Sequence, residues 1–408
     1  MTAMILHTLE ARSARVFATL DARPQLGALW RRFVALSEAT AALSMEDVPV
    51  PEQDILAPIT GSSMVHGDPQ AAQIARQIHS FIQRPGDMMK NPGDVFDRAM
   101  RAGRLTSLVD EDLGGRVAYH TSEEAADWAF ARQDFEIAAP DILRHEAPVT
   151  FRLMALAGMV NKMLPERVPI AERLIFMAAE SAMRREDRLS DPIVGRVLTD
   201  DDHNISAHWT LTPSLALSRG GYRTWSPAST AGRQTLAERL NASLDQNVGR
   251  LGQLNNWIGE VEGFAGQTRK SRRRDLAQLF MKTPVLSAPH VAEELGVTKR
   301  AARSLLDDAC ASNIISLLTQ RSTYRLWSVP FMARLIQDKP VQARRRNLSD
   351  LAVERSQASP ARSSTSPAGQ NMTAGLSESM QSAARDLDDA MAKADLILSR
   401  YTVGNARG

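Results

Sequence analysis

Residues 287–306 read SAPHVAEELGVTKRAARSLL, and their pattern predicts two helices joined by a tight corner. Ser287 is a good N-cap for the first helix, and Gly296 follows that helix where the chain must leave it with a positive φ angle. Val297 is expected to fill the corner, and Thr298 is expected to cap the second helix. This order is typical of a helix-turn-helix, whose second helix reads the major groove of DNA.

The second helix is predicted to have one apolar face and one polar, basic face. We expect four apolar residues to point inward: Ala301, Ala302, Leu305 and Leu306. A basic outer face is what a helix needs in order to bind DNA. The candidate DNA-binding residues are Thr298, Lys299, Arg300, Arg303 and Ser304. The alternative is a helical hairpin that packs inside a larger domain and binds no DNA.

The flanking sequence extends this pattern to a winged helix. An apolar-faced helix is predicted over residues 275–281. The β-prone runs 314–318 and 324–329 lie on either side of a turn-like stretch and predict a hairpin, the wing. Arg321 and Arg325 would lie on this wing and reach toward phosphate or the minor groove.

Basic charge is concentrated in the same part of the chain. Residues 269–329 contain 11 Lys or Arg and 5 Asp or Glu, whereas the whole chain has a formal net charge of +2. Affinity for phosphate requires such a concentration. Five of the basic residues form a run that is either a solvated linker or a clamp on the DNA backbone: Arg269, Lys270, Arg272, Arg273 and Arg274.

Three short motifs mark this segment: Pro-Val at 284–285, Leu-Gly-Val at 295–297 and Tyr-Arg-Leu at 324–326. In these motifs it resembles the winged helix that ends many Fic-family proteins. Catalytic Fic proteins also have a His-Pro-Phe sequence followed by a Gly-Asn-Gly-Arg anion-binding loop. None of the eight histidines begins such a loop. The resemblance therefore implies the fold of this segment and does not imply adenylyl transfer.

The whole chain is similar to a family of plasmid-borne bacterial proteins. These join an N-terminal domain of unknown function to such a helix-turn-helix. This second resemblance implies an architecture and little chemistry.

Length and composition predict a protein of two domains plus tails, because 408 residues exceed the usual size of one domain. The single cysteine, Cys310, excludes a disulfide within the chain and is typical of a reducing cytoplasm. No stretch approaches the roughly 18 to 20 apolar residues of a membrane span, and the N-terminus has no signal-peptide pattern. We therefore expect a soluble, cytoplasmic protein with no membrane partner.

Residues 1–228 are expected to form a helical domain. Helices are predicted over 5–43 with a break at Arg23 and Pro24, and over 70–83, 95–105 and 121–187. Residues 47–69 are predicted to be a loop, and residues 209–217 to form short extended pieces. Five methionines are expected to fill the core: Met154, Met159, Met163, Met177 and Met183.

Residues 200–208, DDDHNISAH, contain three carboxylates and two histidines and so raise the question of a metal site. No His-Glu-x-x-His or comparable spacing is present, and a polar loop is the preferred interpretation. The sequence therefore predicts no catalytic residue, no metal ligand and no cofactor.

Residues 229–268 predict one long helix that connects the domains, forms a dimer seam or belongs to the first domain's core. Its apolar stripe is Leu236, Leu240, Leu244, Val248, Leu251, Leu254, Ile258 and Val261. Residues 337–373 are rich in Ser, Ala, Pro and Arg and predict a disordered linker. Residues 374–402 predict an amphipathic helix that docks on the body, pairs with a second copy or binds a partner.

These observations predict a mainly α protein with a helical domain at 1–228, a connector helix at 229–268 and a winged helix-turn-helix at 269–336. The expected function is sequence-specific DNA binding by a transcriptional regulator. Its expected partners are double-stranded DNA, a second copy in a homodimer, and a small-molecule or protein effector at the N-terminal domain. The alternatives are a Fic-related or toxin-like enzyme with a regulatory winged helix, and an accessory protein of plasmid maintenance.

Overall fold

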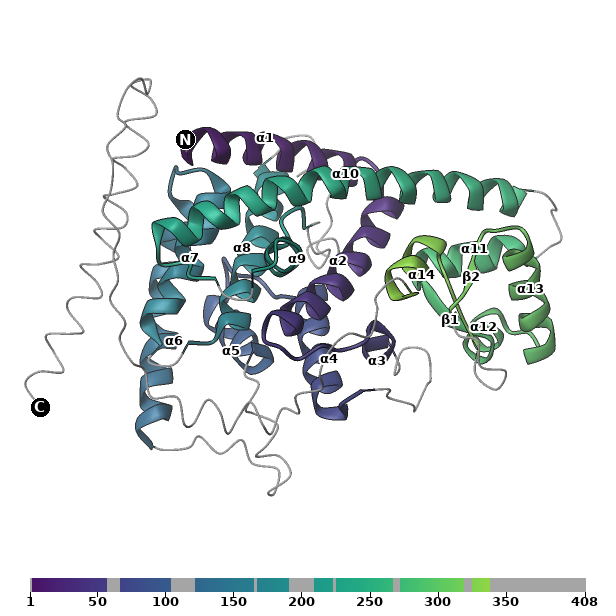
Figure 1. The fold of residues 1–408 in the computed structure, drawn as a ribbon, viewed down its shortest axis with the longest axis horizontal. Coiled ribbons are helices and arrows are strands. Elements are labelled where there is room, and N and C mark those ends of the chain that lie inside the picture. Colours follow the sequence, from purple (N-terminus) through teal and green to yellow (C-terminus); the bar gives the residue numbers. More distant parts are fainter. Residues whose placement is uncertain are drawn as a thin grey trace, which may run out of the picture.

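A computed structural model of the chain describes residues 2–56, 67–103, 122–164, 167–190, 209–222, 225–266, 272–318 and 325–337. Helices make up most of these ranges, and three short strands lie near their C-terminal end (Figure 1). The prediction of a mainly α protein is confirmed. No helix in these ranges is long and apolar enough to cross a membrane.

The N-terminal body is the set of helices α1 to α9. They are α1 (Thr2–Asp21), α2 (Pro24–Met45), α3 (Glu52–Leu56), α4 (Pro69–Gln83), α5 (Pro92–Gly103), α6 (Ser122–Arg144), α7 (Val149–Met163), α8 (Pro169–Ser190) and α9 (Pro213–Arg219). Several begin at a proline, whose fixed φ angle suits the first helical turn and whose missing N–H has no partner there. The predicted break at Arg23 and Pro24 is confirmed.

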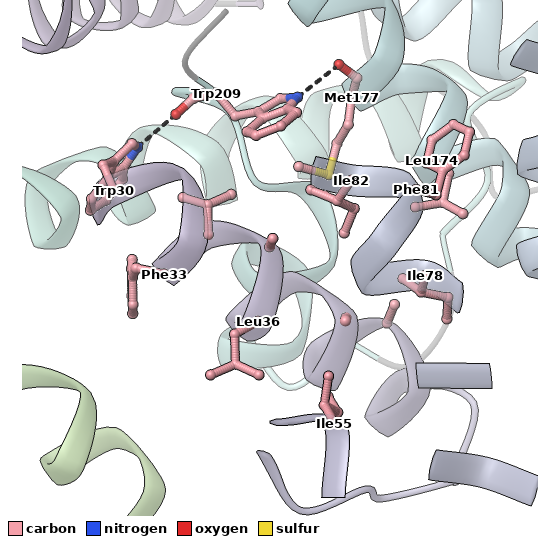
Figure 2. Packing of buried hydrophobic residues seen from close by; sticks show 14 of the residues in the cluster. Trp30, Phe33, Leu36, Ile55, Ile78, Phe81, Ile82, Leu174, Met177 and Trp209 are labelled. Atoms are coloured by element: carbon pink, nitrogen blue, oxygen red, sulfur yellow. Dashed lines mark hydrogen bonds between the residues drawn. The ribbon is translucent and has the colours of Figure 1, made fainter. Parts of the chain in front are cut away.

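Helix α2 is enclosed in the middle of this body. Every residue from 33 to 43 is buried, so the helix packs on all sides and not along one stripe. At its start, Trp30 Nε1 donates to the Trp209 carbonyl (2.7 Å), and Trp209 Nε1 donates to the Met177 carbonyl of α8 (3.2 Å) (Figure 2). These bonds join α2, residue 209 and α8, and they satisfy polar atoms that burial would otherwise leave unpaired.

The predicted core methionines are confirmed. Met154, Met159, Met177 and Met183 are buried, and Met163 packs half-buried against the same core. They lie on α7 and α8, where flexible thioether side chains fill irregular space.

Three predictions for the body are wrong in part. The predicted loop 47–69 contains the short helix α3, and its residues 57–66 lie outside the described ranges. Residues 209–217 were expected to be extended, but α9 begins at Pro213. Residues 121–187 are not helical throughout, because non-helical connections separate α6, α7 and α8. The residue before a proline disfavours helix, and Pro148 and Pro169 stand at these connections.

Helix α10 (Thr230–Gly266) runs along the body and on to the C-terminal helices (Figure 1). It contacts α1, α2 and α9, and beyond them α11. Seven of the eight residues in the predicted stripe are buried, but Val248 is 57% exposed because its position on the helix faces away from the body. Trp257 and Phe264 are also buried and extend the stripe toward the C-terminal helices.

The C-terminal domain contains four helices and a small sheet. Its elements are α11 (Arg273–Lys282), β1 (Val285–Ser287), α12 (Ala288–Leu295), α13 (Lys299–Ala311), β2 (Ser316–Leu317), β3 (Leu326–Ser328) and α14 (Pro330–Gln337). The sheet order is β1-β3-β2 and both pairs are antiparallel, with Trp327 opposite Leu286 on one side and Leu317 on the other. The predicted hairpin strands are present, whereas β1 was not predicted.

Some predicted features lie outside the described residues. They are the polar loop at 200–208, the tip of the wing at 319–324, the linker predicted at 337–373 apart from Gln337, which ends α14, and the helix at 374–402.

Candidate nucleic-acid interface

The corner between α12 and α13 has the geometry that its sequence predicts. Ser287 Oγ accepts from His290 N (3.4 Å) and caps α12, and Gly296 has a φ angle of 61°. Thr298 Oγ1 accepts from Ala301 N (3.2 Å) and caps α13. A left-handed glycine between two capped helices fixes where the first ends and the second begins.

Helix α13 is held by one narrow apolar stripe. Ala302, Leu306 and Ala309 are buried at intervals of four and three residues, and Val291 of α12 is buried against them. Leu305 is half-buried and packs against the same core. The prediction that Ala301 points inward is wrong, since it is exposed beside the stripe.

The remaining face of α13 is open to solvent. Lys299, Arg300, Arg303 and Ser304 are exposed, as is the capping residue Thr298. Among the described residues, no carboxylate forms an ion pair with the three cations. The helix lies at the outer edge of the molecule, away from the N-terminal body (Figure 1). The structure thus places the five candidate residues of this helix together on one accessible surface.

The two candidate residues of the wing have different outcomes. Arg325 is half-buried and comes directly before β3. Arg321 lies outside the described residues. Of these two residues the structure therefore places only Arg325, at the start of the central strand of the sheet.

The arginine run at the entrance of the domain does not act as one unit. Arg273 pairs with Asp308 of α13 (Nη2–Oδ2 2.5 Å), and its guanidinium lies 4.8 Å from the centre of the Phe264 ring of α10. Arg272 pairs with Asp275 (3.1 Å), whereas Arg274 is exposed. Arg273 is therefore a structural link between α10, α11 and α13, a role the sequence pattern did not show. Arg269 and Lys270 lie outside the described residues.

Two further contacts fix the domain to α10 and α2. Trp257 Nε1 of α10 donates to the carbonyl of Ile314 (2.7 Å), which lies two residues before β2. Arg32 Nη1 of α2 donates to the Met281 carbonyl at the end of α11 (2.9 Å). Burial, and secondarily the charge of Arg31, lower the pKa of Arg32 from its usual value.

Within the described residues, no group of three or more His, Cys, Asp or Glu side chains could hold a metal ion. Cys310 is half-buried near the end of α13 and packs against the core.

A family model described as an HTH DNA binding domain matches residues 274–329. This range runs from the first turn of α11 to the residue after β3. No curated protein matches the chain. The C-terminal domain is therefore a helix-turn-helix domain similar to those that bind DNA, and the matched range includes no residue of α1 to α9.

Proposed function

We propose that this protein is a sequence-specific DNA-binding regulator of transcription, and that α13 enters the major groove. The observation that carries the proposal is the outer face of α13, where Lys299, Arg300 and Arg303 are exposed and form no ion pair within the described residues. A solvent-exposed cation without a carboxylate partner is available to phosphate oxygens or to the acceptor edge of guanine.

The residues of this face have separate roles in the proposal. Arg300 and Arg303 contact bases or phosphates, and Lys299 contacts phosphate as a point charge. Thr298 caps the helix with its hydroxyl, and Ser304 adds a short polar contact. The strands β2 and β3 form a wing that carries Arg321 and Arg325 to the neighbouring backbone.

The rest of the chain is proposed to control this domain. Residues 1–228 form the domain that receives a small-molecule or protein effector, and residues 229–268 connect it to the winged helix at 269–336. A homodimer is proposed because helix-turn-helix proteins usually read two half-sites with two copies.

The test is retention of genomic fragments, including the region upstream of the gene itself, by the purified full chain across a salt series. We expect sequence-selective retention with a steep dependence on salt. The variant Arg300→Gln/Arg303→Gln should lose this selectivity. A matched variant, Arg15→Gln/Arg144→Gln, removes the same charge from exposed positions on α1 and α6 and should keep it.

Two results would change the proposal. Absence of retention at low salt by the folded protein would reject DNA binding and leave the domain a structural or protein-binding role. Retention confined to fragments near a replication origin would replace transcriptional regulation by plasmid maintenance.

A further inference from the structure

Polar side chains are buried where α2, α9 and α10 meet. Glu38 of α2 is 1% exposed, and its carboxylate accepts hydrogen bonds from the backbone N–H groups of Ser214 (2.5 Å) and Leu215 (2.9 Å). These N–H groups belong to the first turn of α9, where they have no partner within the helix. Helix α9 is therefore fixed to α2 by polar bonds as well as by apolar packing.

Helix α10 contributes two buried polar residues to this junction. Ser243 and Asn247 lie one turn apart and are 4% and 1% exposed. Ser243 Oγ and Asn247 Nδ2 have no hydrogen-bond partner within the described parts of the chain. Buried donors without partners cost free energy, so two of them on one helix face indicate a polar ligand at this place.

Two guanidinium groups contact α10 at Asn247 and at its neighbour Gln246. Arg219 Nη1, at the end of α9, donates to Gln246 Oε1 (2.9 Å), and Arg250 Nη1 donates to Asn247 Oδ1 (3.3 Å). The unpaired Nδ2 belongs to the same planar amide as the oxygen that Arg250 contacts, so it lies next to that guanidinium.

Neither guanidinium is neutralised by an ion pair in the part of the chain that the structure describes. Within the described ranges, no carboxylate forms an ion pair with Arg219 or Arg250. Arg219 is exposed as a whole residue, but surrounding atoms displace part of the water about its guanidinium. This desolvation, followed by the charge of Arg250, lowers the pKa of Arg219 to about 10, and desolvation also lowers the pKa of Arg250. The charge of buried Glu38 opposes the effect on Arg219 without pairing with it. An anion placed here would remove the repulsion.

The chemistry of the junction favours one class of ligand. Two guanidiniums, an amide N–H and a hydroxyl are all able to donate hydrogen bonds. An anion with several oxygens, such as a phosphate or a carboxylate, is the class of ligand that accepts from donors of this kind, and guanidinium groups bind such oxygens in pairs.

The junction also touches the helix-turn-helix domain. The Arg250 guanidinium lies 5.5 Å from the centre of the Phe33 ring. The same ring also contacts Phe331 of α14, at a centroid distance of 4.9 Å, and Trp30 of α2, at 5.2 Å. A ligand that moves Arg250 would therefore act on Phe33, one of the side chains that hold the C-terminal domain against α2.

We propose that Arg219 and Arg250 form a binding site for a small anionic effector that carries phosphate or carboxylate groups and adjusts DNA binding through Phe33 and Phe331. The regulatory part rests on the proposed function, because it presumes that α13 binds DNA. The anion site itself is tested without DNA.

The experiment is calorimetric titration of the full chain with inorganic phosphate, and separately with citrate, at constant ionic strength maintained with chloride. We expect at least one anion to bind, and Arg219→Gln/Arg250→Gln to weaken it by about tenfold or more. Binding of phosphate but not citrate would show that the site selects phosphate groups, and binding of citrate but not phosphate would show that it selects carboxylates. The matched variant Arg300→Gln/Arg303→Gln should bind the anion as the unchanged protein does, because those residues lie on the DNA face.

Failure of both anions to bind at millimolar concentrations would overturn the site. A loss caused by Arg300→Gln/Arg303→Gln but not by Arg219→Gln/Arg250→Gln would overturn it too, because the anion would then mimic DNA phosphate. If circular dichroism shows that the double variant at the junction is unfolded, Arg219→Gln alone replaces it, since this residue is exposed.

DNA affinity is then measured with and without the bound anion. A change seen in the unchanged protein and absent from Arg219→Gln/Arg250→Gln supports the regulatory role, and equal affinity in both conditions overturns it. Anion binding in a protein that retains no DNA would reject the proposed function and leave the anion site standing.

Discussion

The ring of Phe33 in α2 meets the ring of Phe331 in α14 edge to face, with a centroid distance of 4.9 Å and an interplanar angle of 62°. The two residues are almost 300 positions apart in the sequence, and this contact joins the enclosed helix of the N-terminal body to the last helix of the C-terminal domain. Edge-to-face pairs of this kind contribute stability beyond the area they bury.

We expect Phe331→Ala to lower the free energy of unfolding by about 3 kcal/mol, because a large ring is removed from a packed site. Urea denaturation followed by tryptophan fluorescence measures this change. The control is Phe130→Ala at a residue that is 61% exposed, which should cost less than about 0.5 kcal/mol. Equal effects of the two substitutions would show that the Phe33 contact does not stabilise the protein.

Arg303→Ala should weaken DNA binding without unfolding the domain, because the side chain is exposed and has no ion-pair partner within the described residues. A base contact would make the loss about 1 to 3 kcal/mol and specific to one position of the site. A phosphate contact would instead reduce the salt dependence of log K by about one. A large loss of stability with unchanged DNA affinity would contradict the assignment.

Thr298→Ala should destabilise the start of α13 by about 1 kcal/mol, because it removes the acceptor for the Ala301 N–H. Thermal unfolding of the full chain measures the loss. Thr298→Ser keeps the hydroxyl and should restore most of the stability. If Ser fails to rescue, the threonine methyl group and not the cap carries the effect.

His79 of α4 predicts a dependence of stability on pH. Burial lowers its pKa to about 4, below the usual value of 6.5. As the pH falls from 6.5 to about 4, the unfolded chain therefore takes up a proton that the folded chain does not, and stability declines by about 3 kcal/mol. His79→Gln should remove this decline, as measured by urea denaturation across the same range.

The pH dependence of stability must be compared between the unchanged protein and His79→Gln, because buried carboxylates oppose the effect of His79. Burial raises the pKa values of Glu38 and Glu180. These groups therefore take up their protons at a higher pH in the folded chain than in the unfolded chain. Their contribution to stability increases as the pH falls through the same region. An equal decline in both proteins would show that other groups control it.

The sequence predicted the helix-turn-helix closely because local physical chemistry determines it. Ser287, Gly296 and Thr298 act on neighbouring backbone atoms, and so their roles can be recognised within about twenty residues. The position of Ala301 was predicted incorrectly because the buried stripe of α13 is narrower than a simple apolar face. The strand β1 was missed because its three residues are stabilised by pairing with β3, about forty positions away.

The features that the sequence did not predict depend on distant partners. The first turn of α9 donates two backbone hydrogen bonds to the carboxylate of Glu38, which is far away in the chain. Nothing in the sequence of residues 209–217 indicates that such a partner is present. Arg273 stands in a basic run that was interpreted as a solvated linker or a clamp on the DNA backbone, yet Asp308 and Phe264 make it a structural contact. Composition and periodicity describe a residue's neighbours along the chain, whereas these contacts arise from the folded arrangement.

The hydrogen bond from Trp257 to the Ile314 carbonyl determines which piece of the chain could be inherited as a unit. A recombination event that joined residues 269–336 to a new protein would leave the Ile314 carbonyl without the hydrogen bond from Trp257. It would also remove the contact between Arg273 and the Phe264 ring. A segment that retains both contacts must begin within α10, before Trp257. Transfer of the helix-turn-helix domain between proteins would therefore favour breakpoints inside α10 over breakpoints at residue 269.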